Sequence, residues 1–513
     1  EYVVLLPLMY CHAKLKNISQ HTVISAHLFL PDYSPMNRDS FYPAIACFPL
    51  LLMLAGCAPM HETRQALSQQ TPAVQVDTAL PTALKNGWPD SQWWLEYHDN
   101  QLTSLINNAL QNAPDMQVAE QRIQLAEAQA KAVATQDGPQ LDFSADMERQ
   151  KMSAEGLMGP FALNDPAAGT TGPWYTNGTF GLTAGWHLDI WGKNRAEVTA
   201  RLGTVKARAA EREQTRQLLA GSVARLYWEW QTQAALNTVL QQIEKEQNTI
   251  IATDRQLYQN GITSSVEGVE TDINASKTRQ QLNDVAGKMK IIEARLSALT
   301  NHQTKALKLN PVALPKVASQ LPDELGYSLL ARRADLQAAH WYVESSLSTI
   351  DAAKAAFYPD INLMAFLQQD ALHLSDLFRH SAQQMGVTAG LTLPIFDSGR
   401  LNANLDIAKA ESNLSIASYN KAVVEAVNDV ARAASQVQTL AEKNQHQAQI
   451  ERDALRVVGL AQARFNAGII AGSRVSEARI PALRERANGL LLQGQWLDAS
   501  IQLTGALGGG YKR

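Results

Sequence analysis

The chain has 513 residues and a formal net charge of −4, with 45% hydrophobic and 18% charged residues. This near-neutral charge gives no indication of a nucleic-acid partner or an acidic ligand. A mean hydropathy of −0.21 and the lack of an apolar run of about 18 residues exclude a bundle of membrane-spanning helices, whereas a β-barrel stays possible because its strands are only half apolar.

The N-terminal region has the features of a bacterial lipoprotein signal. A short polar start from Met36 is followed by an apolar core, 41–54, that is too short to span a membrane as a helix. The core ends in LAGC at 54–57, which resembles a lipobox, so we expect cleavage before Cys57 and acylation of its thiol. An ordinary signal peptide that happens to contain a cysteine is the alternative.

The first 100 residues contain all the cysteines of the chain and are interpreted as three segments. The three cysteines are Cys11, Cys47 and Cys57, so we expect neither disulfides nor thiol chemistry in the body. We interpret 1–35 as translated upstream sequence, 36–56 as the signal peptide, and 57–100 as a lipidated arm. The arm carries the aromatic residues Trp88, Trp93, Trp94 and Tyr97, which we expect to pack it onto the body rather than to bind a ligand.

A first repeat, 101–310, follows the arm. We expect, in order, a helix over 101–136 broken at Pro114, a strand at Leu141–Met147, a long loop over 151–178, a strand at Phe180–Ile190, a helix from Gly192 to about Gln259, a turn at Asn260-Gly261, and a helix over 265–300. At about 1.5 Å per residue the longest helix would reach roughly 100 Å. His187 and Asp189 alternate with the apolar residues of the second strand, which predicts that both line a lumen.

A second repeat, 311–513, copies the first. Asp115 and Pro139 match Asp335 and Pro359 at a spacing of 220, so Leu141–Met147 matches Ile361–Leu367. Phe180–Ile190 matches Met385–Ile395 at a spacing of 205, and Gly261 matches Gly468 at 207. The second long helix, 398–466, has small apolar residues at alternating spacings of four and three that predict a coiled-coil seam: Val423, Val427, Val430, Ala434, Val437 and Ala441.

The motifs together resemble the outer-membrane factor family of tripartite efflux pumps, which is TolC-like, and its NodT-type multidrug efflux lipoproteins in particular. The segments that carry the resemblance are LAGC at 54–57, TAGWHLDIWGKNRA at 183–196, AAFYPDINL at 355–363, LTLPIFDSGR at 391–400, ARFNAGI at 463–469 and ALGGGY at 506–511. The resemblance implies an α+β membrane protein: a homotrimer whose chains each supply four strands to one β-barrel, continued by a long α-helical barrel.

The same resemblance assigns roles to the turns farthest from the barrel. It implies that the turns at Gly261 and Gly468 contact a periplasmic adaptor protein, and that acidic residues six and nine positions after each glycine close the pore. Counting gives Glu267 and Glu270 in the first repeat, but Arg474 and Glu477 in the second. Arg474 departs from the family pattern and suggests an ion-pair constriction, although plain solvated tip charges are the alternative.

No constellation of residues indicates an enzyme. Gly192-Lys193 lacks the glycine spacing of a phosphate loop, and the glycines at 508–510 are more typical of a helix stop. We expect no metal and no cofactor beyond the lipid on Cys57. The chain is thus interpreted as a passive multidrug exit duct, lipid-anchored in the cell outer membrane and coupled through its adaptor to an inner-membrane pump. A duct for metal-ion efflux and a coiled-coil lipoprotein without a pore remain the alternatives.

Overall fold

The computed structural model describes residues 60, 66–69, 84–85, 87–153, 155, 174–262, 265–301, 307–316, 319–320 and 326–511. These residues all belong to one compact unit, 57–513. The expected upstream sequence 1–35, the signal peptide 36–56 and Cys57 lie outside the described residues.

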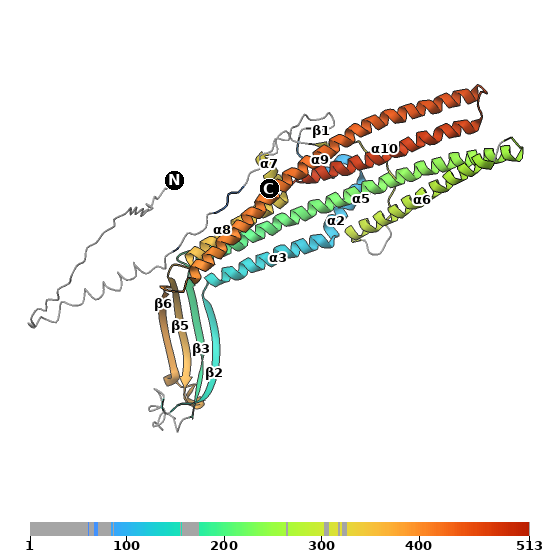
Figure 1. Ribbon diagram of the computed structural model, residues 1–513. Coiled ribbons are helices and arrows are strands. Elements are labelled where there is room, and N and C mark those ends of the chain that lie inside the picture. The colour runs from blue at the N-terminus through green and yellow to red at the C-terminus, as the bar shows by residue number, and fades with distance from the viewer. Residues whose placement is uncertain are drawn as a thin grey trace, which may run out of the picture. The chain divides into compact units, whose positions relative to one another are not determined.

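One antiparallel sheet contains the four predicted strands (Figure 1). Their order is β2 (Gln140–Lys151), β3 (Trp174–Leu188), β5 (Asp360–Ala371) and β6 (Gln383–Thr392). β3 begins inside the segment predicted as loop, and β6 ends before the predicted Ile395. Pro394 accounts for the early end of β6, because proline has no N–H to donate to a strand ladder.

The helices follow the predicted order. They are α2 (Asn100–Asn112), α3 (Pro114–Ala134), α5 (Lys193–Gln259), α6 (Ser265–Leu299), α7 (Gly326–Arg332), α8 (Ala334–Ala355), α9 (Arg400–Asn466) and α10 (Gly472–Ala506). Pro114 separates α2 from α3 at the first helical position, where its missing N–H has no cost. Within the described part of the chain, every helix is too short or too polar to cross a membrane.

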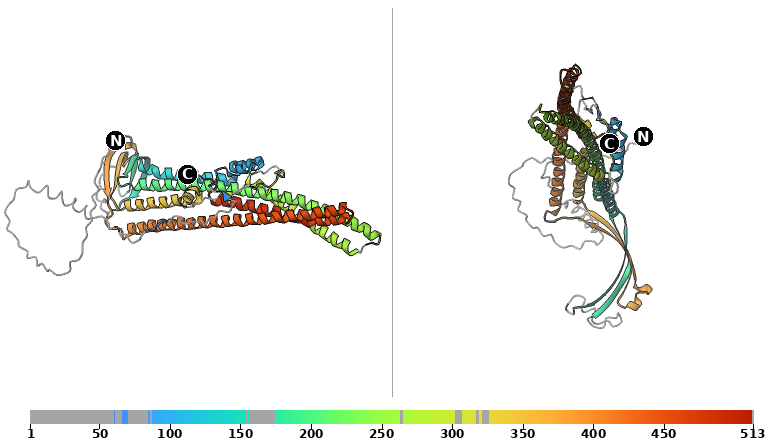
Figure 2. Two further views of the ribbon diagram at one scale, coloured as in Figure 1. Left: turned by 90° about the horizontal axis from the view of Figure 1, so that it is seen from above. Right: turned by 90° about the vertical axis from the view of Figure 1, so that its right-hand side faces the viewer.

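The two long helices, each of 67 residues, organise the packing. Near the sheet α5 lies between α3 and α8, and α9 packs on α8; toward the tips α5 packs on α6 and α10, and α9 on α10 (Figures 1 and 2). The order α3, α5, α8, α9 therefore repeats the order of the strands that join these helices. Each strand continues into the helix layer without a change of neighbour.

Two apolar clusters hold the middle of the helices. In the first, the arm packs onto α5 as predicted, with Trp94 only 1% exposed and the rings of Tyr97 and Trp228 5.3 Å apart. In the second, the predicted seam of α9 faces α8 and α10, and its residues Val423, Val430, Ala434 and Val437 are buried. The coiled-coil spacing read from the sequence is thus confirmed as a buried stripe.

The hydrogen-bond register corrects the predicted match between the repeats. Gln140 pairs with Gly185 in the first hairpin, and Asp360 pairs with Thr392 in the second. Since 140 and 360 differ by 220, β3 and β6 are related by 392 − 185 = 207 positions and not by the predicted 205. A slip of two residues leaves every side chain on its own face, so the alternation of the sequence could not reveal it.

Candidate functional site

One face of the sheet is apolar across all four strands. Residues that oppose each other in an antiparallel pair share a face, and Phe143, Leu182, Leu367 and Met385 form one such row across the sheet. These side chains lie at the surface, and Phe143 and Met385 are 67% and 68% exposed. An exposed apolar face of this breadth requires an apolar partner or lipid.

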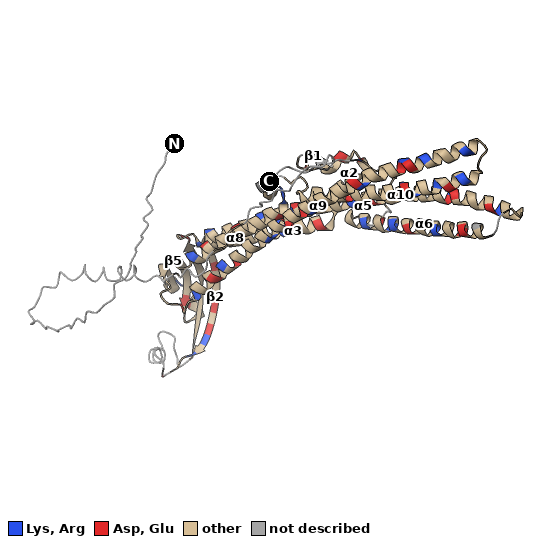
Figure 3. Ribbon diagram, turned by 45° about the horizontal axis from the view of Figure 1, so that its top comes forward, with Lys and Arg blue, Asp and Glu red and all other residues tan. Residues whose placement is uncertain are grey.

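The opposite face is polar and carries most of the sheet's glycines. A Cβ on Gly181 would collide with the backbone of Gln368, and a Cβ on Gly386 would collide with the ring of Phe366. Larger cross-strand neighbours therefore lie over the glycines, as happens on the concave side of a curved sheet. Along β2, at one edge of the sheet, Asp142, Asp146 and Glu148 lie on this polar face, and the basic residues Arg149 and Lys151 follow them on the other face near the end of the strand (Figure 3).

Each strand-to-helix junction is closed by an aspartate. Asp189 accepts hydrogen bonds from the backbone N–H of Asn194 at 3.1 Å and of Arg195 at 2.9 Å, at the start of α5. Asp397 accepts from Gly399 at 3.0 Å and Leu401 at 2.8 Å, at the start of α9. These carboxylates satisfy N–H groups that the helix leaves without intrahelical partners.

The prediction that Asp189 lines a lumen is therefore wrong. β3 ends at Leu188, and the Asp189 side chain is 7% exposed beneath Arg195, whose Nε lies 3.6 Å from its Oδ2. Gly192 makes this geometry possible, because its φ of 78° lies in the left-handed region that side chains avoid. His187 does lie on the polar face, with its Nδ1 3.4 Å from a carboxylate oxygen of Asp360.

Aromatic side chains surround the same junctions. Trp186 Nε1 donates to the carbonyl of Asp137 at 2.9 Å, and Trp191 Nε1 donates to the carbonyl of Pro359 at 2.8 Å. Trp191 also stacks on Tyr358, with ring centroids 5.0 Å apart. All three rings remain between 41% and 49% exposed. The two tryptophans thus join the end of β3 and the turn before α5 to the segments that connect α3 with β2 and α8 with β5.

The two turns at the tips have the same construction. Gly261 and Gly468 both have a φ of 71°. Ile262 N donates to Leu257 O and Ile469 N to Arg464 O, each at 2.9 Å, which is the Schellman hydrogen-bond pattern. Both isoleucines are 70% exposed. Each tip thus presents an apolar side chain on a rigid helix end.

The predicted gate residues lie close to these turns. Arg474 and Glu477 form an ion pair at 2.7 Å between neighbouring turns of α10, with side chains 68% and 41% exposed. Glu270 is exposed on α6, and the side chain of Glu267 lies outside the described residues. Within one chain the Arg474 pair runs along a helix rather than across an opening, so the gate stays a prediction.

Sequence reasoning missed the ion pair that joins the two hairpins near the tips. Arg479 on α10 lies 3.3 Å from a carboxylate oxygen of Glu246 on α5, and it donates to Gln462 on α9 at 3.2 Å. The available signal was a difference between the repeats: 207 positions before Arg479 stands Asp272, so the charge is reversed.

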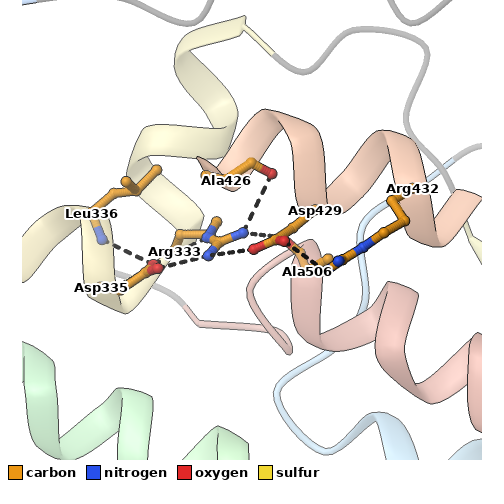
Figure 4. Close-up of polar contacts among 7 residues, drawn as sticks. All are labelled: Arg333, Asp335, Leu336, Ala426, Asp429, Arg432 and Ala506. Carbon is orange, nitrogen blue, oxygen red and sulfur yellow. Dashed lines mark hydrogen bonds and ion pairs between the residues drawn. The ribbon is translucent and has the colours of Figure 1, made fainter. Parts of the chain in front are cut away.

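A second unpredicted cluster centres on Arg333 in the middle of the helices (Figure 4). Its guanidinium binds both oxygens of Asp335, at 3.0 and 2.6 Å, and donates to the Ala506 carbonyl at 3.2 Å. It also lies 3.8 Å from Asp429, whose other partner is Arg432. This side chain, 12% exposed, joins α8, α9 and α10.

The C-terminal glycines close the same region against the arm. Gly508 and Gly510 have φ values of 95° and 79°, and a Cβ on them would collide with backbone atoms of Arg332 and Asp90 respectively. The predicted helix stop is confirmed, since α10 ends at Ala506. The glycines do more than stop the helix, because they let three segments distant in sequence meet backbone to backbone.

A buried tyrosine secures the arm from the other side. Tyr227 donates to Asp99 at 2.7 Å, and Asp99 also caps α2 by accepting from Leu102 N at 2.8 Å. Burial first, and then the hydrogen bond to Asp99, raise the pKa of the Tyr227 phenol. The tyrosine therefore stays a neutral donor at every physiological pH.

The chain matches known proteins over most of its length. A family model described as outer membrane efflux protein matches residues 105–302 and 325–509. The multidrug resistance outer membrane protein MdtQ of Escherichia coli O157:H7 is 99% identical over 478 residues, which cover 93% of this chain and 100% of the relative. MdtP of Shigella flexneri, described in the same words, is 36% identical over 466 residues, covering 90% and 94%.

Solved structures of outer-membrane proteins share the fold. VceC of Vibrio cholerae superimposes with a TM-score of 0.70 at 25% identity, over 83% of this chain and 100% of that one. The outer-membrane channel OprN gives 0.74 at 20% identity, over 88% and 99%.

Proposed function

The chain belongs to the outer membrane efflux protein family, and from this premise we propose that a trimer of it forms the exit duct of a multidrug efflux pump. It is an efflux protein of the outer membrane and not an enzyme. Multidrug cargo is the finer part of the proposal, and it is supported by relatives at 99% and 36% identity that both carry this description.

The main observation that supports a trimer is that both edges of the four-stranded sheet are open within one chain. Among the described strands, β2 and β6 each have one neighbour only. Backbone groups left unpaired in hydrocarbon cost several kcal/mol each, so a sheet with an apolar face cannot stay open in a membrane. Copies of the same sheet would close the edges into one barrel, with the apolar face toward lipid and the polar, glycine-rich face toward the lumen.

The helices would extend this barrel as a periplasmic tunnel, since their order follows that of the strands. Trp186, Trp191 and Tyr358 would then mark the membrane–water boundary, where aromatic rings are favoured. A lipid on Cys57 would anchor the arm in the same outer membrane. Mass spectrometry of the mature N-terminus tests the anchor, and an unmodified Cys57 would reject it.

The tips would receive a periplasmic adaptor that links the duct to an inner-membrane pump. The turns at Gly261 and Gly468 support this because each holds an exposed aromatic residue and an exposed isoleucine on a rigid cap: Tyr258, Ile262, Phe465 and Ile469. Arg474 and Glu477, with Glu267 and Glu270, would form the charged constriction that the adaptor opens.

Bilayer conductance of the purified protein tests the duct and its gate together. Wild-type protein should form channels that are closed most of the time, and a protein without any channel would be a scaffold instead. Arg474→Asp and Glu477→Ala should raise the closed-state leak, because each removes one partner of the pair. A leak and cation block identical to those of the wild type would remove these residues from the gate.

Cargo is tested in cells. A strain that lacks this gene should become sensitive to dyes and antibiotics, and the plasmid-borne gene should restore resistance. Sensitivity to metal salts alone would favour a metal-ion duct instead.

A further inference from the structure

We propose that neighbouring copies meet along a seam whose register is set by the internal repeat of the chain. In this seam β6 and α9 of one copy pack on β2 and α3 of the next, as β3 and α5 pack on β5 and α8 within one chain. The inference rests on the proposed trimer and adds which residues face each other in it.

The repeat offsets convert an observed strand pair into a predicted one. Ala184 on β3 pairs with Ala365 on β5. Adding 207 to the first number gives Leu391 on β6, and subtracting 220 from the second gives Ala145 on β2. Leu391 of one copy should therefore lie opposite Ala145 of the partner subunit.

The neighbouring pairs are compatible in side-chain character. By the same offsets, the observed pair Leu182–Leu367 corresponds to Ala389 with Met147 of the partner subunit. This predicted pair continues the apolar face. On the other face, the observed pair Gly185–Met364 corresponds to Thr392 with Ser144 of the partner subunit. This predicted pair continues the polar face. A closed barrel requires this agreement on both faces.

The helices give an independent indication, since α5 already buries the matching stripe against α8. A Cβ on Gly203 would lie 3.0 Å from the Cβ of Ser345, which also donates to the Ala200 carbonyl at 2.7 Å. Ala200 is 8% exposed, and Ala207 and Ala210 of the same stripe are 0% and 4% exposed. Small residues thus allow α5 and α8 to approach closely.

On α9 the equivalent stripe is exposed within one chain. The positions 207 further on are Ile407, Ala410, Leu414 and Ala417, and Ile407 and Leu414 are 57% and 68% exposed. The position equivalent to Ser345 on α3 is Leu125, which is 60% exposed. Leu125 of the partner subunit would then lie against Ala410, between two exposed apolar side chains that it would cover.

A register shifted by two residues is the competing arrangement. The spacing of 205, which aligns Thr183-Ala184-Gly185 with Thr388-Ala389-Gly390, would place Ala389 opposite Ala145 of the partner subunit. Both arrangements keep each side chain on its own face. The offset of 207 is preferred because it holds in the hairpin pairing, at the junction glycines 192 and 399, and at the tip glycines 261 and 468.

Disulfide cross-linking in the full-length protein distinguishes the two registers. No cysteine follows Cys57 in the sequence, so introduced pairs have no thiol background in the body. Leu391→Cys with Ala145→Cys should yield covalent dimers and trimers on mild oxidation in membranes. Ala389→Cys with Ala145→Cys should yield almost none, because diagonal Cβ atoms lie roughly 7 Å apart, beyond disulfide reach. An equal or larger yield from the second pair would overturn the register.

A helix variant tests the other half of the seam. Leu414→Asp should abolish the trimer while far-ultraviolet circular dichroism still reports folded helices. The control is Leu202→Asp, which changes a 48% exposed leucine on α5 whose equivalent on α9 is Lys409, and it should leave the trimer intact. A trimeric Leu414→Asp protein would remove α9 from the seam.

The native mass separates failure of the seam from failure of the trimer. If the unmodified protein in detergent has the mass of one chain, the proposed trimer itself fails. If it is a trimer but the shifted cysteine pair cross-links preferentially, only the register fails.

Discussion

The middle of the helices and their tips are held by different kinds of contact. In the middle, Arg333 is 12% exposed and binds groups from three helices, and Gly508 and Gly510 press against backbone from distant segments. At the tips, Arg474 is 68% exposed and forms an ion pair with Glu477 on its own helix.

We interpret the middle of the helices as a rigid joint and the tips as a surface that is open to partners. Buried, multiply bonded groups fix one arrangement of the helices, whereas exposed pairs contribute little to stability and can exchange partners. Substitutions should therefore have large effects on stability in the middle and small ones at the tips.

The largest effect is expected from Gly510→Val. Its Cβ would collide with the backbone of Asp90 and Ser91, and its φ of 79° is unfavourable for a branched side chain. We expect a loss of about 4 kcal/mol from strain and overpacking, measured by denaturant unfolding in detergent. Gly505→Ala is the matched control, since its Cβ would meet open space. A normal unfolding midpoint for Gly510→Val would contradict the close approach.

The next effect is expected from Arg333→Met. It would leave Asp335 and Asp429 without their shared cation, at a cost of about 3 kcal/mol, as for other broken buried pairs. Arg432→Met is the control: this arginine binds the same Asp429 at 3.0 Å but is 67% exposed, so we expect a loss below about 1 kcal/mol. Equal losses from both variants would show that burial of Arg333 does not decide the difference.

A smaller and local effect is expected from Gly468→Ala. Alanine at a φ of 71° costs about 1 kcal/mol, which should open the tip without lowering the global unfolding midpoint. Hydrogen exchange of the Ile469 amide should become faster. Gly261→Ala should do the same for Ile262, because the two turns have the same hydrogen bonds. A fall in the global midpoint would place the tips within the rigid joint.

The smallest effect is expected from Glu451→Gln, also in the tip half. Burial raises the pKa of this carboxyl, which lies where a Cβ on Gly489 would be. Because the pKa is higher in the folded than in the unfolded state, the folded protein is favoured while the carboxyl is protonated. This contribution to stability is fully present below the unfolded value of 4.5 and is lost as pH rises through the folded pKa, where the carboxyl becomes charged. The variant should be slightly more stable than wild type at pH 7 and lose this advantage near pH 4. Destabilisation at pH 7 would reverse the sign and reject the burial argument.

Periodicity and breaker residues were sufficient to predict most elements. Pro114 and the glycines at 261 and 468 end helices where expected, and the alternation in Phe180–Ile190 predicted a strand that leads into a long helix. These features depend on neighbours in sequence, so a single sequence contains them.

The features that escaped prediction depend on contacts between distant segments. The register of β6 was not predicted, because a shift of two residues leaves the alternation of apolar and polar side chains unchanged. The capping role of Asp189 was not predicted, because it depends on whether the strand ends one residue before Asp189 or continues through it. Arg333 and Arg479 have partners that lie on other helices. Nothing local marks them as different from other charged residues.

The contacts of the C-terminal glycines also determine when the fold can be completed during biosynthesis. Gly510 packs against Asp90, which lies 420 positions earlier in the sequence and near the front of the described body. A chain still emerging from the ribosome or the translocation machinery lacks this contact until Gly510 has appeared, because Asp90 emerges long before it. The helices can form segment by segment, but the joint between them can close only after Gly510 has emerged, and a chain truncated before Gly508 should leave it open permanently.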